Sequence, residues 1–380
     1  MNFDFSEDHR LLQEMVRKFA IQEIEPIAGK IDAAGEYPRE TIAKLADLGL
    51  LGVVVPEKYG GAGMDFTSLA IVVEEVSRAC ASHGVILAVH NSLIAWPIVL
   101  FGTEEQRQRF LPGVGSGATL GAFALTEPEA GSDAGSLRTR AVPDGDAFIL
   151  TGSKLWITSA VAAGLFLVAA RTEPKAGKKG ISLFLVERGA PGLSVGKHED
   201  LMGVRATGNG SLSLEGVRVP AANMLGEPNQ GFPILMSLLD TSRIDIGAQA
   251  VGIAGAALDY ATRYARERVQ FGKPISEHQM IQQMLAEMAT EVDAARLLVY
   301  RAGWLKDSGA PRFTREAAMA KVFASETAVS VTRRAVQILG GYGYSREYPV
   351  ERYYRDAKVT EIYEGTSQIQ KMVIARLLLA

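Results

Sequence analysis

The sequence predicts a multidomain α+β protein, in which a helical N-terminal domain precedes a middle antiparallel β-domain and a C-terminal four-helix bundle. With 380 residues, the chain exceeds the size that a single hydrophobic core usually serves. Apolar residues recur at helical spacing near both ends of the chain, whereas the middle has short β-branched runs between glycines and prolines. We therefore expect domains at residues 1–120, 121–230 and 231–380.

The N-terminal region has the pattern of several amphipathic helices. Ser6 can cap the first of them, and the apolar residues of its buried side are Leu11, Leu12, Met15, Val16 and Phe19. Pro38 can open a second helix. Residues 79–102 contain no Asp, Glu, Lys or Arg, and a stretch of this length could cross a bilayer. It does contain histidine, asparagine and proline, so we expect a buried core helix, because unpaired polar groups are costly in lipid.

Four segments of the middle region are typical of short strands, at residues 147–158, 165–171, 181–187 and 211–219. In the last of these, Ser211 to Leu214 alternate between polar and apolar, as a half-buried strand does. No helical pattern separates the strands. A small antiparallel sandwich or barrel is therefore predicted.

The C-terminal region returns to long helices. Its clearest amphipathic face comprises Ile281, Met284, Leu285, Met288, Val292 and Ala295. Helix-breaking residues occur at 272–274, 308–311 and 340–341. Long segments with short connections predict an antiparallel bundle of four helices.

The composition narrows the class of protein. Hydrophobic residues make up 47% and charged residues 22% of the chain, which is ordinary for a globular protein and argues against disorder. The net charge of −3 does not favour a nucleic-acid partner. The single cysteine, Cys80, permits no intramolecular disulfide, and the five histidines form no zinc pattern, so no metal site is predicted. The first ten residues lack the features of a targeting segment, and the expected location is the cytoplasm.

Three loops and strand ends could bind a ligand. Small and hydroxyl residues in 125–133 would let backbone N–H groups approach a ligand, although an ordinary capped loop has the same composition. Trp156 could stack on a planar ring beside the Thr158 hydroxyl, or could pack in a core. Arg268 could hold a pyrophosphate with its fork of donors, or could be a solvated surface residue.

Two further motifs lie at helix ends. Residues 337–341 end a helix with a glycine cap. Glu364 is on a turn before two hydroxyl residues that can cap the last helix. A glutamate there could act as a base or could simply precede a helix N-terminus. The chain has no dinucleotide-binding glycine motif after a strand, no phosphate-binding P-loop and no nucleophile elbow, so those three enzyme classes are not predicted.

Taken together and in this order, the five motifs resemble those of the acyl-CoA dehydrogenase family over essentially the whole chain, and the short-chain butyryl-CoA dehydrogenases most of all. The resemblance implies a non-covalent FAD between the β-domain and the bundle. The implied cofactor contacts are Phe123, Leu125, Thr126, Ser132, Trp156, Ile157, Thr158, Arg268, Phe271, Gln279, Gln337, Gly340, Gly341, Thr366 and Gln368. In this family the flavin-end and adenine-end contacts come from different subunits, which implies a homotetramer built as a dimer of dimers.

The resemblance also implies a reaction. Glu364 would remove the α-proton of an acyl-CoA thioester, flavin N5 would accept the β-hydride, and a trans-2-enoyl-CoA would form, as in fatty acid oxidation. The implied substrate contacts are Ser132, Asp240, Arg243 and Gly365. Reduced flavin would pass its electrons to electron-transfer flavoprotein. Some members of the family place their base just before the arginine equivalent to Arg243, where this chain has Ser242, so the resemblance implies the short-, medium- or short-branched-chain type. Residues 88–93 look most like those of short-chain members, so we expect a short or short-branched acyl chain.

Three other functions remain open at this stage. The same fold is used by acyl-CoA oxidases and by flavin monooxygenases, and a flavin-bearing relative could bind a partner without catalysis. The glutamate at position 364 favours the dehydrogenase over the monooxygenase, because only the dehydrogenase needs that base.

Overall fold

A computed structural model describes residues 4–380 and begins with a helical region. Its elements are α1 (Glu7–Phe19), η1 (Ala20–Ile24), α2 (Glu25–Ala34), α3 (Arg39–Asp47), η2 (Glu57–Tyr59), α4 (Phe66–Ala79), α5 (Ala81–Ala88), η3 (Val89–Ala95), α6 (Trp96–Phe101) and α7 (Glu104–Gly115). The predicted cap of α1 is confirmed, since the Ser6 side chain accepts a hydrogen bond from the His9 N–H at 3.1 Å. The segments η1 and η3 are π-helices, in which each backbone hydrogen bond spans one residue more than in an α-helix. The sequence pattern did not predict them.

The apolar stretch before α7 is buried inside the protein. The run Ala81–Phe101 is long and apolar enough to cross a bilayer, but 78% of its most apolar window is buried. Its polar residues have partners: His90 contacts the carbonyl oxygen of Val114 at 2.9 Å, and the Asn91 amide donates to that of Leu50 at 3.1 Å. These contacts confirm the prediction of a core segment.

The middle region forms one eight-stranded sheet. Its strands are β1 (Gly121–Ala124), β2 (Arg140–Asp144), β3 (Ala147–Ile157), β4 (Leu165–Arg171), β5 (Ile181–Glu187), β6 (Leu193–Val195), β7 (Gly210–Pro220) and β8 (Met224–Leu225), with short helical turns η4 (Ala134–Ser136), η5 (Pro174–Gly180) and η6 (Ala221–Asn223) between some of them. The four predicted strands are confirmed to within a residue at each end.

The sheet is mixed rather than wholly antiparallel. The strand order is β6-β7-β3-β2-β4-β5-β8, and β1 pairs in parallel with β4, with Gly121 opposite Leu165. The β2–β3 hairpin lies in the chain between β1 and β4, and this long connection allows the parallel pairing. The expected antiparallel arrangement therefore holds for most of the sheet but not for β1 or for the end of β2 that touches β4.

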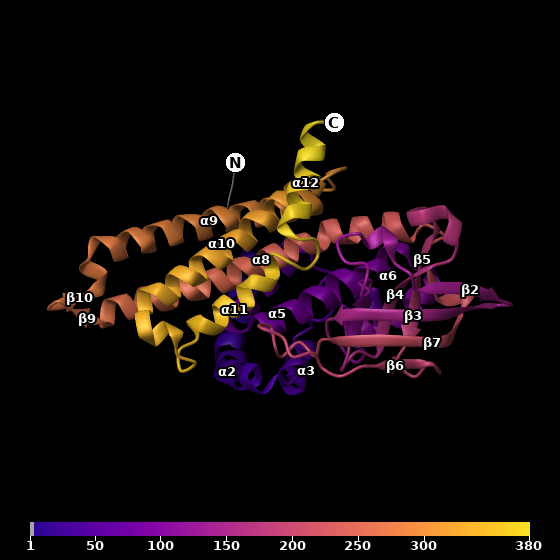
Figure 1. The fold of residues 1–380 in the computed structure, drawn as a ribbon, viewed down its shortest axis with the longest axis horizontal. Helices are drawn as coiled ribbons and strands as arrows, with labels where there is room; N and C mark the ends of the chain where they lie inside the picture. The colour runs from indigo at the N-terminus through magenta and orange to yellow at the C-terminus, as the bar shows by residue number, and fades with distance from the viewer. Residues whose placement is uncertain (1–3) are drawn as a thin grey trace.

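The C-terminal region forms the predicted bundle. Its elements are α8 (Gly231–Glu267), β9 (Val269–Gln270), β10 (Lys273–Pro274), η7 (Ile275–Glu277), α9 (Gln279–Asp307), α10 (Thr314–Leu339), η8 (Gly340–Tyr344), α11 (Val350–Thr360) and α12 (Ser367–Leu378). Figure 1 shows α8, α9 and α10 side by side, with the sheet at one end of α8 and the β9–β10 hairpin at the other. A continuous core joins the N-terminal helices to this bundle, mainly where α4 packs on α8.

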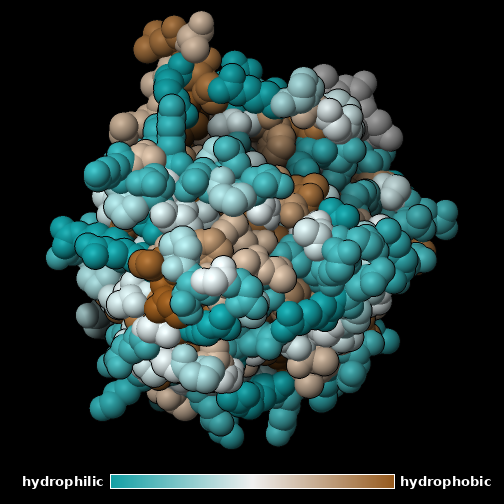
Figure 2. Space-filling view, turned by 90° about the vertical axis from the view of Figure 1, so that its right-hand side faces the viewer, coloured by the Kyte–Doolittle hydropathy of each residue, from teal (hydrophilic) through white to brown (hydrophobic). Residues whose placement is uncertain are grey.

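The end of the molecule that carries the sheet has a largely hydrophilic surface. In Figure 2, hydrophobic residues occur there only in scattered groups. The apolar residues of the sheet instead fill its own core, where Phe166 and Phe184 are fully buried. The sheet domain is thus stabilised by its own apolar core.

Candidate active site

Glu364 is on the tight turn between α11 and α12. Its backbone has φ of 51°, and Gly365 follows with φ of 97°. The turn ends where the Thr366 hydroxyl caps α12 by accepting the Ile369 N–H at 3.3 Å, as the sequence predicted. A left-handed backbone is costly for a residue with a side chain, and such strain tends to occur at functional sites. In residues 4–380, Trp156, Phe271 and Glu364 are three of the six non-glycine residues with positive φ.

Two fully buried side chains hold this turn. The Lys321 amine of α10 donates to the Gly365 carbonyl oxygen at 2.8 Å. The Gln370 amide of α12 donates to the same oxygen at 2.9 Å and to the Glu364 carbonyl oxygen at 3.3 Å. A Cβ on Gly365 would lie 2.5 Å from the Gln370 amide nitrogen. The turn therefore requires glycine at 365, and the position of Glu364 is fixed from two helices.

The environment of the Glu364 carboxyl group favours its protonated form. Its Oε2 atom is buried and accepts no hydrogen bond. Burial raises the pKa of Glu364 from 4.5 to about 7, against the opposing effects of the Ser242 hydroxyl and the charges of Lys321 and Arg243. A general base works best when its pKa is near the working pH, and this environment brings a glutamate there.

Beside Glu364, α8 presents an ion pair. The Arg243 guanidinium donates to Asp240 Oδ1 at 2.6 Å, and the Thr314 hydroxyl donates to Oδ2 at 2.5 Å. Arg243 is 4% exposed, and its Nε has no hydrogen-bond partner among the described residues. The structure thus brings the predicted residues Asp240 and Arg243 together with Glu364, and leaves a buried donor and a buried acceptor facing no protein group.

A buried ion pair between Lys154 and Glu127 holds the loop 125–133 of the sheet domain in place. The Lys154 amine donates to Glu127 at 2.8 Å and to the Leu125 carbonyl oxygen at 3.1 Å. Glu127 also accepts the N–H groups of Arg138 and Thr139. Burial lowers the pKa of Lys154 to about 8, opposed by the charge of Glu127. Neither Glu127 nor Lys154 had been predicted to matter, but together they fix both ends of the loop 125–139.

A backbone hydrogen bond places two predicted motifs, the loop 125–133 and the segment of Trp156, side by side. The Leu155 N–H donates to the Thr126 carbonyl oxygen at 2.9 Å, so the loop lies against the end of β3. There the pairing of β3 with β7 is irregular, and Trp156 adopts φ of 60° with 56% of the residue exposed. The neighbouring Ile157 points into the core of the sheet instead, so it can offer a ligand only its backbone.

The other predicted residues gather at the far end of the bundle. Arg268 ends α8, and its guanidinium lies 5.3 Å from the centre of the Tyr342 ring in η8. This contact joins the residue that precedes the Phe271 turn to η8, whose first residues are Gly340 and Gly341. Gln279 begins α9, which follows the turn. Phe271 is 95% exposed, and a Cβ added to either glycine would meet nothing within 4 Å.

The candidate site is therefore in two parts within one chain. Arg243 and Arg268 are on the same helix, about 38 Å apart at 1.5 Å per residue. The Glu364 turn lies against α8 near Arg243, and Trp156 lies with the loop 125–133 at the sheet end of the molecule. The remaining predicted positions, Phe123 in β1, Ser132 and Thr158 nearby, and Gln368 on the exposed side of α12, also belong to the sheet end or to the Glu364 turn.

Three family models match successive parts of the chain. They describe the N-terminal, middle and C-terminal domains of acyl-CoA dehydrogenase, and match residues 6–118, 122–217 and 229–379. A short-chain specific acyl-CoA dehydrogenase from Bos taurus is 50% identical over 98% of this chain and 90% of its own. The solved butyryl-CoA dehydrogenase of Megasphaera elsdenii is 44% identical, with a TM-score of 0.98 and full coverage of both chains.

The chain belongs to the acyl-CoA dehydrogenase family. It is an oxidoreductase of the FAD-dependent type that defines this family. A further solved chain, described as electron transferring flavoprotein of Acidaminococcus fermentans, is 46% identical with a TM-score of 0.98 over the full length of both chains.

The surfaces of an acyl-CoA dehydrogenase chain fit FAD in chemical terms. Trp156 offers a half-exposed aromatic face beside a loop of small and hydroxyl residues, which suits a planar ring. Arg268 offers a guanidinium beside the open backbone of Gly340 and Gly341, which suits a pyrophosphate that must approach closely. The two surfaces lie at opposite ends of α8.

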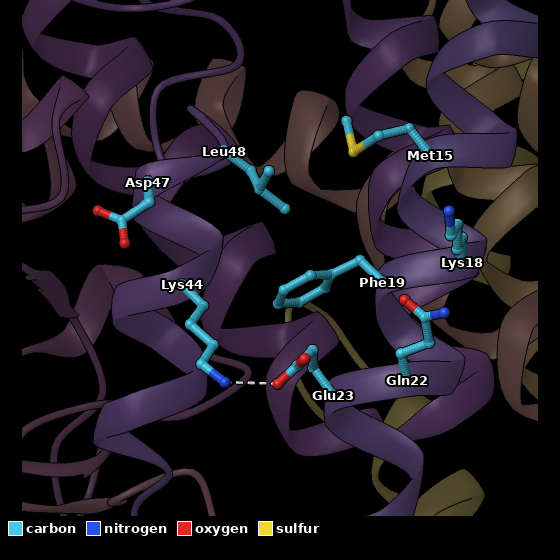
Figure 3. Close-up of a pocket in the computed structure, with 8 residues that line it drawn as sticks. All are labelled: Met15, Lys18, Phe19, Gln22, Glu23, Lys44, Asp47 and Leu48. Atoms are coloured by element: carbon cyan, nitrogen blue, oxygen red, sulfur yellow. Dashed lines mark hydrogen bonds and ion pairs between the residues drawn. The ribbon is translucent and has the colours of Figure 1, made fainter.

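A surface groove lies apart from these residues, between the helix α1–η1 and α3 (Figure 3). It has a volume of about 360 Å³ and is lined by Met15, Lys18, Phe19, Gln22, Glu23, Lys44, Asp47 and Leu48. Phe19 and Leu48 point toward each other across it, and Lys44 pairs with Glu23 at 2.5 Å. No residue predicted for the active site lines this groove.

Proposed function

We propose that Glu364 removes the α-proton of a short-chain acyl-CoA, and that the chain thereby forms a trans-2-enoyl-CoA. The observation that carries this proposal is the Glu364 carboxyl, of which the oxygen Oε2 is buried without a hydrogen-bond partner among the described residues, an environment that raises its pKa to about 7. A carboxylate in water is too weak a base for a thioester α-proton. Burial of the same group raises its basicity, and the fixed turn holds it in one place.

The turn around Glu364 would also stabilise the charge that develops during proton removal. The backbone N–H of Glu364 belongs to a turn whose carbonyl oxygens are held by Lys321 and Gln370. An N–H held in this way can donate to the thioester carbonyl with little reorganisation. Arg243, held by Asp240 at 2.6 Å, supplies a positive charge nearby that favours the same negative charge.

FAD, when bound, supplies the acceptor for the hydrogen that leaves the β-carbon with its electron pair. Phe123, Leu125, Thr126, Ser132, Trp156, Ile157, Thr158, Thr366 and Gln368 would hold its flavin end, and Arg268, Phe271, Gln279, Gln337, Gly340 and Gly341 its pyrophosphate and adenine end. The distance between these sets within one chain supports a site completed by a second copy. We therefore propose a homotetramer built as a dimer of dimers, located in the cytoplasm.

The substrate and the electron acceptor follow from the relatives. The bovine and Megasphaera relatives are named for short-chain acyl-CoA and butyryl-CoA, and we assign a short or short-branched acyl-CoA to this chain, held by Ser132, Asp240, Arg243 and Gly365. The similarity to a chain described with electron-transferring flavoprotein supports the same type of acceptor here.

Anaerobic flavin reduction tests the proposal. Mixing the purified, FAD-loaded protein with butyryl-CoA should bleach its flavin absorbance, while Glu364→Gln should retain the flavin and lose most of the bleaching. Glu361→Gln is the matched control, because Glu361 pairs with Lys358 on the same side of the turn but not in the site. Full activity of Glu364→Gln would place the base elsewhere. Rapid reoxidation by air after bleaching would identify an oxidase instead.

A further inference from the structure

Asp245, one turn beyond Arg243 on α8, is a buried carboxyl group without a partner. The residue is 0% exposed, and neither of its carboxyl oxygens has a hydrogen-bond partner among residues 4–380. The Ser92 hydroxyl of η3 interacts with the group, but its single proton goes to the Ala88 carbonyl oxygen at 2.7 Å. Burial raises the pKa of Asp245 well above its ordinary value, which favours the protonated, neutral form of the group.

Such a group is an exception in this protein. Of the other fully buried carboxyl groups, Glu74 accepts hydrogen bonds from Arg296 and Tyr300. Glu75 binds Arg17, and Asp356 accepts the Val204 N–H. An unpaired polar group in a core costs free energy, and native proteins rarely leave one without a function. Among these carboxyl groups, Asp245 is the one whose oxygens accept no hydrogen bond from the described residues, which leaves it available to a ligand.

The position of Asp245 on α8 points to the active site. Ser242 precedes it by three residues and Gln249 follows it by four, so the three side chains lie along one side of the helix. Ser242 interacts with the Glu364 carboxyl, and Gln249 accepts a hydrogen bond from the Tyr363 hydroxyl. Asp245 thus lies between the two contacts that α8 makes with the segment carrying the base.

A neutral carboxyl group has a specific chemical preference. It donates one hydrogen bond through its O–H and accepts others through its carbonyl oxygen. A hydroxyl group can satisfy both at once, whereas an apolar chain end leaves both unsatisfied. A substrate carboxylate would meet the charge of Glu364, which already acts unfavourably on an ionised Asp245.

We infer that Asp245 is a specificity-determining residue, and that it binds a hydroxyl group on the acyl chain beyond the β-carbon. This inference rests on the proposed function and narrows its substrate to short hydroxyacyl-CoA thioesters. Asp245 takes no part in the bond changes, which stay with Glu364 and the cofactor. Asp245 would disfavour an acyl chain of equal size that ends in a methyl group, because binding of that acyl chain would leave the buried Asp245 carboxyl without a hydrogen-bond partner.

The test compares two substrates of equal length, 4-hydroxybutyryl-CoA and pentanoyl-CoA, which differ in one hydroxyl against one methyl group. For the holoenzyme we expect kcat/KM, measured by anaerobic flavin reduction, to favour the hydroxyacyl substrate by at least about tenfold. Asp245→Val should reverse this preference, and Asp245→Asn, which can still donate and accept, should keep part of it. Thr332→Val is the control, because Thr332 is also buried but bonds only within α10.

The possible results separate this inference from the proposed function. Reduction by pentanoyl-CoA that equals or exceeds that by 4-hydroxybutyryl-CoA in the wild type overturns the role of Asp245 and leaves the dehydrogenase intact. No reduction by either substrate overturns the proposed function itself. An equal gain or loss on both substrates in Asp245→Val shows that the carboxyl is structural, bridged by buried water. The flavin absorbance of each variant reports whether it has folded with its cofactor.

Discussion

The amine of Lys321 donates a 2.8 Å hydrogen bond to the carbonyl oxygen of Gly365, so a lysine of α10 anchors the residue next to Glu364. Lys321 is fully buried, and burial lowers its pKa to about 8, opposed by the charge of Glu364. One side chain thus sets both the position of Glu364 and part of its electrostatic environment.

Removal of this amine should slow the reaction by two routes. In Lys321→Met the turn loses an anchor, and the pKa of Glu364 rises further because the charge of Lys321 had lowered it. We expect kcat to fall by about 10- to 100-fold and the acidic limb of its pH profile to move to higher pH. Lys371→Met is the control, since Lys371 pairs with Glu326 on the surface. An unmoved pH profile would show that Lys321 has only a structural role.

The pH dependence of activity should report Glu364 directly. Proton removal needs the ionised carboxylate, so kcat/KM should rise with pH through a midpoint near 7. Ser242→Ala should move this midpoint upward, because the Ser242 hydroxyl favours the charged form. Stopped-flow flavin reduction between pH 5 and about 9 measures both midpoints. A midpoint near the ordinary glutamate pKa would contradict the assignment.

Stability should change with pH in the opposite sense. The pKa of Glu364 is raised in the folded protein to about 7 from 4.5, so between these values the unfolded chain has lost a proton that the folded chain retains. Its contribution to the free energy of unfolding therefore falls as pH rises through this window. Glu364→Gln should be more stable than the wild type at pH 8, by about 1–3 kcal/mol, and the difference should vanish near pH 4. Thermal unfolding of both proteins across this range provides the measurement.

Gly365 should not tolerate a side chain. Gly365→Ala places a Cβ against the Gln370 amide in a left-handed backbone, and we expect a loss of about 1–3 kcal/mol together with most of the activity. Gly309→Ala is the matched control, because Gly309 also has positive φ, 71°, but open space around it. If both variants lose activity equally, backbone strain alone explains the effect and the contact with Gln370 does not matter.

The pair of Lys154 and Glu127 should be essential for the loop 125–139, which we propose to bind flavin. Lys154→Met leaves the Glu127 carboxylate buried beside fewer donors, at a cost of about 3–5 kcal/mol, and flavin should be lost with it. The double variant with Glu127→Gln should recover part of the stability. Arg218→Met, which breaks an exposed pair with Asp146, should change little. Urea unfolding and flavin content distinguish these variants, and an unaffected flavin content in Lys154→Met would refute the role of the pair.

The sequence predicted most of the elements because their signals are local. The Ser6 and Thr366 caps and the strands of the sheet follow from neighbouring residues, and the structure confirms them. The parallel pairing of β1 with β4 could not be predicted, because it depends on segments about 40 residues apart meeting only in the folded sheet.

The sequence pointed to Glu364 and Arg243 as candidate site residues, but not to the residues that hold them in place. Glu364 and Arg243 stand in recognisable motifs. Lys321 follows a run of alanines and methionine in an ordinary amphipathic helix, and nothing local shows that its amine reaches a distant turn. Asp245 is similar, since its spacing from Ser242 was visible but its lack of a partner exists only in three dimensions.

The length of α8 has a consequence for inheritance. Arg243 lies within the first half of its 37 residues and Arg268 directly follows its last residue, Glu267, so a damaging change near one arginine leaves the region around the other intact in the same chain. If the proposed dimer shares its site between two chains, a mixed dimer of one chain with Glu364→Gln and one with Arg268→Ala would contain one undamaged site. Two defective alleles of this gene could therefore restore activity to each other when expressed in the same cell, although neither does so alone.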